Sequence, residues 1–335
     1  MNKSWGKMSA IAAGAALLVS ACSSSATSSS SSTSTASSTA SSAAPNSVAP
    51  LTNMTVAYAA TGAGYSDLYV GVTDGIFKKY GLNVTLVQIT PANLVSALIS
   101  GSAQIGGAVA DGVAAAILKG EPLEYVALTE GTYNLQLWVN KNITSIKQLA
   151  GQTLALTTQG SETDFGLTDL LQQNGMSPTS VTRKYLVSAA QQISAVRSGA
   201  AAGGLFQPPT AQTLTQSGGH VLASLSNLPY AVGAYSATTS YVSSHPQAVK
   251  DFYDAEVANL AYIRSHPSQT EAAIEKYNPQ TTAANAAIAY NFFLNVWKPS
   301  PVVTESLIQA AFQRAATKAK TSVPSNVAQY IYPAP

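Results

Sequence analysis

The feature that most constrains the fold is a regular alternation of short apolar runs and helical patterns, which starts near residue 52. Apolar runs such as "MTVAYAA" and "NVTLVQI" have the length and composition of strands. Amphipathic segments such as "PANLVSALISG" separate these runs and end at glycines, as helices do. Residues 54–130 thus read as strands at 54–60, 83–89, 103–109 and 123–130, with helices between them at 65–81, 91–101 and 111–120. This order predicts a mostly parallel sheet with helices on both faces.

The pattern starts again in the second half of the chain. Residues 134–219 contain apolar runs and amphipathic segments that predict strands at 134–141, 152–158, 181–187 and 200–206, and helices at 161–175, 190–199 and 208–219. In both halves a helix ends at Ser-Gly and a short strand of small residues follows, at 100–107 and at 198–204. This repetition indicates two similar α/β lobes. Beyond Tyr230 the sequence predicts helices, at 246–265, 267–277, 281–297 and 304–320.

Two glycine-rich turns resemble nucleotide-binding loops without completing either motif. Gly101 and Gly106 have the spacing of a phosphate-binding loop, but Gly107 and Ala108 stand where such a loop has Lys and Ser or Thr. The stretch at 62–67, Gly-x-Gly-x-x-Asp, lacks the third glycine of a dinucleotide fingerprint. We therefore expect no nucleotide and no other cofactor. The glycines instead allow a sharp turn from strand to helix.

Few residues are suited to metal binding or nucleophilic catalysis. Cys22 is the only cysteine, and the histidines number three: His220, His245 and His266. His245 and His266 each stand between Ser and the Pro that starts a helix, where a structural role is sufficient. The chain therefore has too few cysteines and histidines to favour a thiolate or histidine metal site or a Ser-His triad. We expect no metal and no enzymatic activity.

The first 50 residues have the pattern of a bacterial lipoprotein leader. Lys3 and Lys7 precede the apolar stretch "MSAIAAGAALLVS", and "LVSAC" places small residues before Cys22. We expect residues 1–21 to be a signal peptide, Cys22 to be lipidated, and the Ser/Thr/Ala-rich residues 22–50 to be a flexible tether. The protein would then be anchored on the extracytoplasmic face of the bacterial membrane.

The charge balance argues against a nucleic-acid partner. Only 10% of the residues are charged, and without Lys3 and Lys7 the 17 basic residues fall to 15 and balance 15 acidic ones. A nucleic-acid-binding protein derives most of its affinity from neutralising phosphates with Lys and Arg. A chain with a net charge near zero does not fit that class.

The region from residue 52 to residue 219 resembles a known transport family. The stretches that carry the likeness are "DLYVGVTDGIFKKYGLNVTLVQI", "ALISGSAQIGGA", "ILKGEPLEYVAL", "NITSIKQLAGQTLALTTQGSETDFGLTDLLQQNGMSPTSV" and "AVRSGAAAGGLFQPP". Together they resemble the nitrate/sulfonate/taurine and thiamine-pyrimidine family of ABC-transporter substrate-binding proteins. The chain departs from the family at Gln104 and Ala202, where an Asp is common three residues after the glycine.

The resemblance implies a type II periplasmic-binding-protein fold, in which two α/β lobes close on a small molecule and are joined by two crossing strands. Lobe 1 would comprise residues 51–130 and 235–335, and lobe 2 residues 131–234 with the hinge strands. The expected partners are a small-molecule ligand, the permease and ATPase subunits of an ABC importer, and the membrane through the lipid anchor. The protein itself is expected to be a monomer.

Ligands of open α/β sheets bind beyond the carboxyl ends of the strands, at helix N-termini. In this chain those places are the segments at 61–67, 107–111, 157–163 and 206–210, together with the two crossings. The candidate ligand-binding residues are Thr61, Gly64, Tyr65, Ser66, Ala108, Val109, Asp111, Glu130, Tyr133, Thr158, Ser161, Glu162, Gln207 and Tyr235. Helix capping alone would explain Ser161, and the helix dipole alone would explain Asp111 and Glu162.

None of the four segments contains Lys or Arg. Four tyrosines and four acids are expected near the cleft instead: Tyr65, Tyr133, Tyr230 and Tyr235, and Asp67, Asp111, Glu130 and Glu162. We therefore favour a neutral or cationic heterocycle, such as a pyrimidine or thiamine precursor, held by tyrosine stacking and a carboxylate. Alternatives are an aliphatic sulfonate, taurine or nitrate bound by the same fold, and, in another class, a ligand sensor or a thiamine-pyrimidine synthase-like enzyme. That synthase family is marked by a cysteine-rich motif, which this chain lacks.

Overall fold

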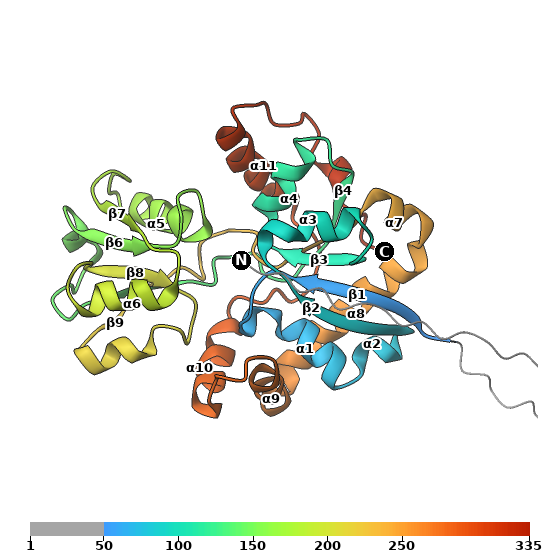
Figure 1. The fold of residues 1–335 in the computed structure, drawn as a ribbon, viewed down its shortest axis with the longest axis horizontal. Coiled ribbons are helices and arrows are strands. Elements are labelled where there is room, and N and C mark those ends of the chain that lie inside the picture. Colours follow the sequence, from blue (N-terminus) through green and yellow to red (C-terminus); the bar gives the residue numbers. More distant parts are fainter. Residues whose placement is uncertain (1–49) are drawn as a thin grey trace, which may run out of the picture. The chain divides into compact units, whose positions relative to one another are not determined.

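The computed structural model describes residues 50–335, in which two five-stranded sheets form the centres of two lobes (Figure 1). The expected signal peptide, the lipidation site Cys22 and all but the last residue of the expected tether lie outside the described residues. None of the described helices is both long enough and apolar enough to span a membrane.

The lobe 1 sheet has the strand order β2-β1-β3-β10-β4. Its strands are β1 (Thr52–Tyr58), β2 (Leu82–Gln88), β3 (Ile105–Ala108), β4 (Leu123–Leu128) and β10 (Ala234–Thr238). β1 pairs in parallel with β2 and β3, whereas β10 pairs antiparallel with β3 and β4. Strand β10 therefore enters lobe 1 after the chain has already passed through lobe 2.

Helices cover both faces of this sheet because successive side chains of a strand point to opposite faces. Met54, Val56 and Tyr58 of β1 belong to one core, and Ala57 belongs to the other. The first core packs against α1 (Ser66–Thr73), α2 (Ile76–Lys79), α8 (Pro246–Ser265), α9 (Pro267–Tyr277) and α10 (Ala283–Phe293). The second packs against α3 (Pro91–Ile99), α4 (Ala110–Ile117) and α11 (Glu305–Ala319), and the short helix α7 (Thr239–Ser244) follows β10.

The lobe 2 sheet repeats this topology in the order β7-β6-β8-β5-β9. Its strands are β5 (Gln136–Val139), β6 (Thr153–Leu156), β7 (Thr182–Tyr185), β8 (Gly203–Phe206) and β9 (His220–Ser224), with α5 (Glu162–Gln173) and α6 (Ala189–Arg197). β6 pairs in parallel with β7 and β8, and β5 pairs antiparallel with β8 and β9. The similarity expected from the sequence repeat is therefore present in the pairing of the strands.

Two chain segments cross between the lobes and run antiparallel to each other. The amide of Tyr230 donates to the carbonyl of Gly131 (3.0 Å), and the amide of Val232 donates to the carbonyl of Glu130 (3.1 Å). The amide of Tyr133 donates to the carbonyl of Leu228 (3.1 Å). These paired crossings are the connection that the type II binding-protein fold requires.

Several local predictions were wrong. The helix expected at 65–81 is two helices, because the chain breaks at Gly75, whose φ of 69° lies in the left-handed region. The helix expected at 208–219 is a short 3-10 helix, Gln212–Ser217. Strands β9 and β10 were not predicted, and β10 lies where a mainly helical region was expected to begin. The antiparallel strands β5 and β10 are why neither sheet is fully parallel.

Candidate ligand-binding site

A cavity of about 520 Å³ lies between the lobes, and we call it the inner cavity. Lobe 1 contributes the segment after β1, the first turns of α3 and the turn from β3 into α4. Lobe 2 contributes residues 157 and 160–162 at the start of α5 and Gln207 after β8, and the crossings contribute Glu130, Asn134, Tyr230 and 232–233. The volume is in the range that drug-sized ligands occupy.

The lobes approach each other on two sides of this cavity. A Cβ atom at Gly62 would lie 2.5 Å from Oε1 of Gln207, so the lobe 2 side chain rests directly on the lobe 1 backbone. A Cβ atom at Gly160 of lobe 2 would lie 3.6 Å from Nζ of Lys318, which belongs to α11. The inner cavity is therefore bounded by contacts between the lobes.

Ten of the fourteen candidate residues line the inner cavity: Thr61, Gly64, Tyr65, Ala108, Val109, Asp111, Glu130, Ser161, Glu162 and Gln207. Ser66, Tyr133, Thr158 and Tyr235 do not line it. The buried Ser66 hydroxyl donates to the carbonyl of Ala63 (2.6 Å). The hydroxyls of Tyr133 and Tyr235 donate to Asp169 (2.6 Å) and Asp67 (2.7 Å), so both side chains are used within the protein.

The tyrosines offer little free ring surface for stacking. Tyr133, Tyr230 and Tyr235 are at most 1% exposed, and the rings of Tyr133 and Tyr230 stack on each other with their centres 4.2 Å apart. Only Tyr65 among the four is partly exposed, and its hydroxyl donates to the carbonyl of Gly107 (3.1 Å). Tyr133 and Tyr230 are therefore packed in the hinge and Tyr235 in the lobe 1 core, so only Tyr65 offers a ring for stacking.

Glu130 is buried at the floor of the inner cavity, with 2% of its surface exposed. Its Oε2 accepts a hydrogen bond from Nδ2 of Asn134 (2.8 Å). Its Oε1 lies 2.5 Å from the position that a Cβ atom would take at Gly64, so a glycine there is what admits the carboxyl group. Burial raises the pKa of Glu130 well above its usual value, and the nearby carboxylates of Asp67 and Glu162 raise it further.

Glu162 is the first residue of α5 and brings a second carboxyl group to the inner cavity from lobe 2. Its Oε1 is buried and has no hydrogen-bond partner among residues 50–335. Burial raises the pKa of Glu162 to about 7, against a smaller opposing effect of the Asn134 backbone. This carboxyl group therefore changes its charge near neutral pH.

Asp111, in the first turn of α4, is the third acid of the cavity wall, and it is already neutralised. Arg314 of α11 forms a bidentate pair with it, with both N···O distances at 2.7 Å. The described ion pairs are Arg314 with Asp111, Arg183 with Asp164 and Lys250 with Asp254, so none involves Glu130 or Glu162. The lining residues include no Lys or Arg.

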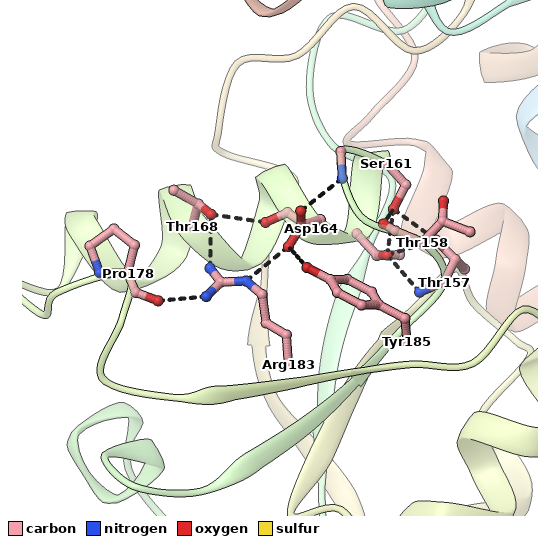
Figure 2. A network of polar contacts seen from close by, with 10 residues as sticks. Thr157, Thr158, Ser161, Asp164, Thr168, Pro178, Arg183 and Tyr185 are labelled. Atoms are coloured by element: carbon pink, nitrogen blue, oxygen red, sulfur yellow. Dashed lines mark hydrogen bonds and ion pairs between the residues drawn. The ribbon is translucent and has the colours of Figure 1, made fainter. Parts of the chain in front are cut away.

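A polar network holds the loop before α5 (Figure 2). Asp164 accepts hydrogen bonds from the amide of Gly160 (2.8 Å), from Nε of Arg183 (2.8 Å) and from the hydroxyl of Tyr185 (3.1 Å). Ser161 occupies the expected N-cap position, but its hydroxyl makes no capping bond and lies 2.7 Å from the carbonyl of Thr158 instead. The network fixes the cavity wall that carries Ser161 and Glu162.

Apolar residues that sequence reasoning missed form much of the remaining wall. Pro91, Leu94 and Val95 of α3 line the inner cavity, as do Val113 of α4 and Val232 of the second crossing. Leu94 also packs in the lobe 1 core, so its periodicity in the sequence indicates only a buried helix face. Arg314 was missed as well, because it lies about 200 residues from its partner and in a helix without family signature.

Two similar α/β lobes, joined by paired crossing segments around a cavity, define a protein with the periplasmic-binding-protein fold. A family model described as NMT1/THI5 like matches residues 63–270, and the chain belongs to this family. A comparison with curated proteins gives no significant match.

Solved structures share the fold at low sequence identity. The periplasmic aliphatic sulphonate binding protein SsuA from Escherichia coli is 20% identical, with a TM-score of 0.68 over 84% of this chain and 97% of that one. The ligand-binding component of an ABC-type import system from Staphylococcus aureus is 12% identical, with a TM-score of 0.67 over 84% and 97%. The periplasmic nitrate-binding protein NrtA from Synechocystis PCC 6803 is 15% identical, with a TM-score of 0.62 over 82% and 83%.

Proposed function

We propose that this protein is the extracytoplasmic solute-binding component of an ABC importer. Closure of the two lobes captures a small molecule, and the loaded protein delivers it to a membrane permease driven by an ATPase. Family membership and the cavity between the lobes support this role. The leader-like sequence before Cys22 supports a lipid anchor that keeps the protein at the membrane surface.

The favoured ligand is a neutral or cationic nitrogen heterocycle of the pyrimidine class. The single observation that carries this proposal is that Glu130 and Glu162 face the inner cavity without a basic partner. A buried carboxyl group is stabilised by a cation or by an N–H donor. Here the ligand would provide the positive charge or the donor, because the protein provides no basic partner. Glu130 would receive N–H groups as an acceptor, and Glu162 would act as the counterion of a positive ring or amine.

A sulfonate or nitrate ligand is the second candidate, because SsuA and NrtA are named for such ligands. An anion in this cavity would lie near two carboxyl groups and would have only hydroxyls and backbone N–H groups as donors. Above about pH 7 the charged Glu162 repels an anion at short distance, and the nearby guanidinium of Arg314 is already paired with Asp111. The charge distribution therefore favours the first candidate.

A binding role is favoured over catalysis by the residues of the cavity wall. The inner cavity is lined by apolar, hydroxyl, amide and carboxyl groups, with neither His nor Cys among them. Those two are the usual general base and thiolate nucleophile of enzymes. A wall without these two residues lacks an imidazole base and a thiolate nucleophile, and its carboxyl groups suit the binding of N–H donors and cations.

Isothermal titration with a panel of ligands tests the proposal. The panel contains a 4-aminopyrimidine, thiamine, riboflavin, taurine, an alkanesulfonate and nitrate. We expect binding of an aminopyrimidine or thiamine, weakened about tenfold or more in Glu162→Gln when the ligand is positively charged. The same substitution outside the cavity, Glu124→Gln in β4, serves as the matched control and should bind like the wild type. Preference for the sulfonate, taurine or nitrate would overturn the proposal.

A further inference from the structure

A second hollow adjoins the inner cavity, and we call it the outer groove. It has a volume of about 740 Å³ and lies between the segment after β8 in lobe 2 and the segment that joins α9 to α10 in lobe 1. Of the candidate ligand-binding residues, Thr61 and Gln207 line it, and both also line the inner cavity. Its volume lies in the range of small-molecule binding sites.

The outer groove and the inner cavity share one wall. Thr61, Gly62 and Gln207 line both of them, and the Gln207 amide, which rests on Gly62, stands between the two. Gly62 has a φ of 139° and leaves room for the Gln207 amide, which a Cβ atom at position 62 would strike. Because the Gln207 side chain makes no hydrogen bond with another residue in 50–335, rotation of this side chain would let a ligand extend from the inner cavity into the outer groove.

The chemistry of the outer groove differs from that of the inner cavity. Its wall contains amide, hydroxyl and proline side chains and no charged residue, with the amides supplied by Gln207, Gln212, Asn278, Gln280 and Asn285. The inner cavity, by contrast, is largely apolar and carries the carboxyl groups of Glu130 and Glu162. One compact ligand cannot match both environments.

The amides of the groove are available to a ligand. The Nδ2 of Asn278 donates to the carbonyl of Ile274 (2.8 Å), but Gln207, Gln212 and Asn285 make no side-chain hydrogen bond with another residue in 50–335. All three are half-buried. A half-buried amide offers two N–H donors and a carbonyl acceptor side by side, which is the pattern that hydroxyl and amide groups of a ligand can satisfy.

We propose that the ligand has two parts: a compact nitrogen-containing head in the inner cavity, and an uncharged tail bearing hydroxyl or amide groups in the outer groove. A ribosyl or similar polyhydroxylated substituent on a nitrogen ring has this chemistry. The identity of the head rests on the proposed function above, whereas the tail rests on the outer groove alone. Binding therefore depends on both ends of the molecule.

Two pairs of compounds test the tail: cytosine with cytidine, and nicotinamide with nicotinamide riboside. Each pair adds a ribose to a nitrogen ring, the second pair with a positively charged ring in the riboside. Isothermal titration of the wild type is expected to give at least about tenfold tighter binding of the riboside in one pair. Thr213→Trp places a bulky ring in the groove from an exposed position, and Gln216→Trp, on the same 3-10 helix but outside the groove, is the matched control.

The proposal predicts that Thr213→Trp removes the advantage of the riboside and leaves the affinity for the base unchanged, whereas Gln216→Trp changes neither. Equal affinities of base and riboside in the wild type would overturn the two-part ligand. If the base still binds, and binds more weakly to Glu130→Gln, the proposed function stands even then. If Thr213→Trp unfolds at the normal temperature but binds neither base nor riboside, the two-part ligand is also overturned. Failure of the wild type to bind any of the four compounds would contradict the proposed function and the two-part ligand together.

Discussion

Arg314 and Asp111 form a bidentate ion pair in which Nε and Nη2 each lie 2.7 Å from a carboxylate oxygen. The guanidinium also lies 4.2 Å from the ring centre of Tyr230 and 5.6 Å from that of Phe165, a residue of α5 in lobe 2. The C-terminal helix α11 thus contacts the hinge and the opposite lobe through one side chain. Asp111 is neutralised by this contact, and Glu130 and Glu162 remain as the unpaired acids of the inner cavity.

Removal of the guanidinium should destabilise the protein. Arg314→Met leaves a partly buried carboxylate unpaired and removes two charge-assisted hydrogen bonds, so we expect a loss of about 2 kcal/mol in the free energy of unfolding. Urea denaturation of Arg314→Met, Asp111→Asn and the double variant measures it. The double variant should lose less than the sum of the two single losses. Additive losses would show that the pair is not coupled.

Release of Arg314 should change the preference of the inner cavity for charge. In Asp111→Asn the guanidinium keeps its charge and loses its carboxylate, so the charge at the cavity wall becomes more positive. We expect weaker binding of a cationic ligand and stronger binding of taurine, each by about tenfold, in titrations at low salt. Asp254→Asn, which breaks the exposed pair with Lys250, is the matched control. Identical selectivity in wild type and Asp111→Asn would contradict this role of the pair.

Binding of a cationic ligand should depend on pH through Glu162. The pKa of this residue is raised to about 7 by burial, so the carboxyl group is mostly neutral below that value and charged above it. Affinity should therefore rise with pH by up to about tenfold per unit below the pKa and level off above it. Titrations between about pH 5.5 and about pH 8 follow this change. Glu162→Gln should bind weakly at every pH, and an unchanged profile in this variant would contradict the assignment.

The stability of lobe 1 should fall as the pH rises, because of two fully buried acids. Asp67 accepts a hydrogen bond from Tyr235, while its Oδ1 and the Oε2 of Glu256 have no partner among the described hydrogen bonds. Burial raises the pKa of both, and the proximity of Asp67 raises that of Glu256 further, so Glu256 retains its proton in the folded protein.

The folded protein therefore binds more protons than the unfolded chain between the ordinary carboxyl pKa, about 4, and the raised values. Stability is fully present below that window and is lost as the pH rises through it. The Glu256→Gln variant keeps a donor without a titrating proton and should flatten this decline in urea denaturation. Equal slopes of unfolding free energy against pH for the variant and the wild type would contradict the retained proton on Glu256.

A methyl group at position 64 should displace the carboxyl group of Glu130 in the inner cavity. Gly64→Ala places Cβ 2.5 Å from Oε1 of Glu130 and 3.4 Å from the ring of Phe293, so the carboxyl group must move. We expect a loss of about 1–3 kcal/mol in the free energy of unfolding, with weakened ligand binding. Gly112→Ala, a helical position with no atom within 4 Å of the added Cβ, should instead be neutral or slightly stabilising. Similar effects of both substitutions would argue against the steric account.

The alternation of strands and helices could be predicted from sequence because each β-α unit is local. Apolar runs set the strands, and glycines such as Gly81, Gly101 and Gly199, all with positive φ, end the helices. Strand β10 was missed because its sequence, "AYSAT", has small and polar residues although four of its five positions are buried. Its place in the sheet depends on strands from distant parts of the chain, which no local pattern reveals.

Part of the candidate site could also be predicted from the sequence. Residues at the ends of strands, such as Thr61, Ala108 and Gln207, follow from a general rule of α/β sheets and do line the inner cavity. Arg314 and the apolar wall of α3 depend on how helices pack over the sheet. The burial of Tyr133, Tyr230 and Tyr235 could not be predicted either, because a tyrosine near a hinge can face either the ligand or the core.

The most direct measurement identifies the molecule that the protein carries. Protein purified from its own host without added ligand is unfolded, and the released small molecules are analysed by mass spectrometry in both ion modes. The acids at Glu130 and Glu162 predict a nitrogen heterocycle, neutral or cationic, at close to one molecule per chain in wild type and depleted in Glu130→Gln. Recovery of a sulfonate or of nitrate would contradict the account.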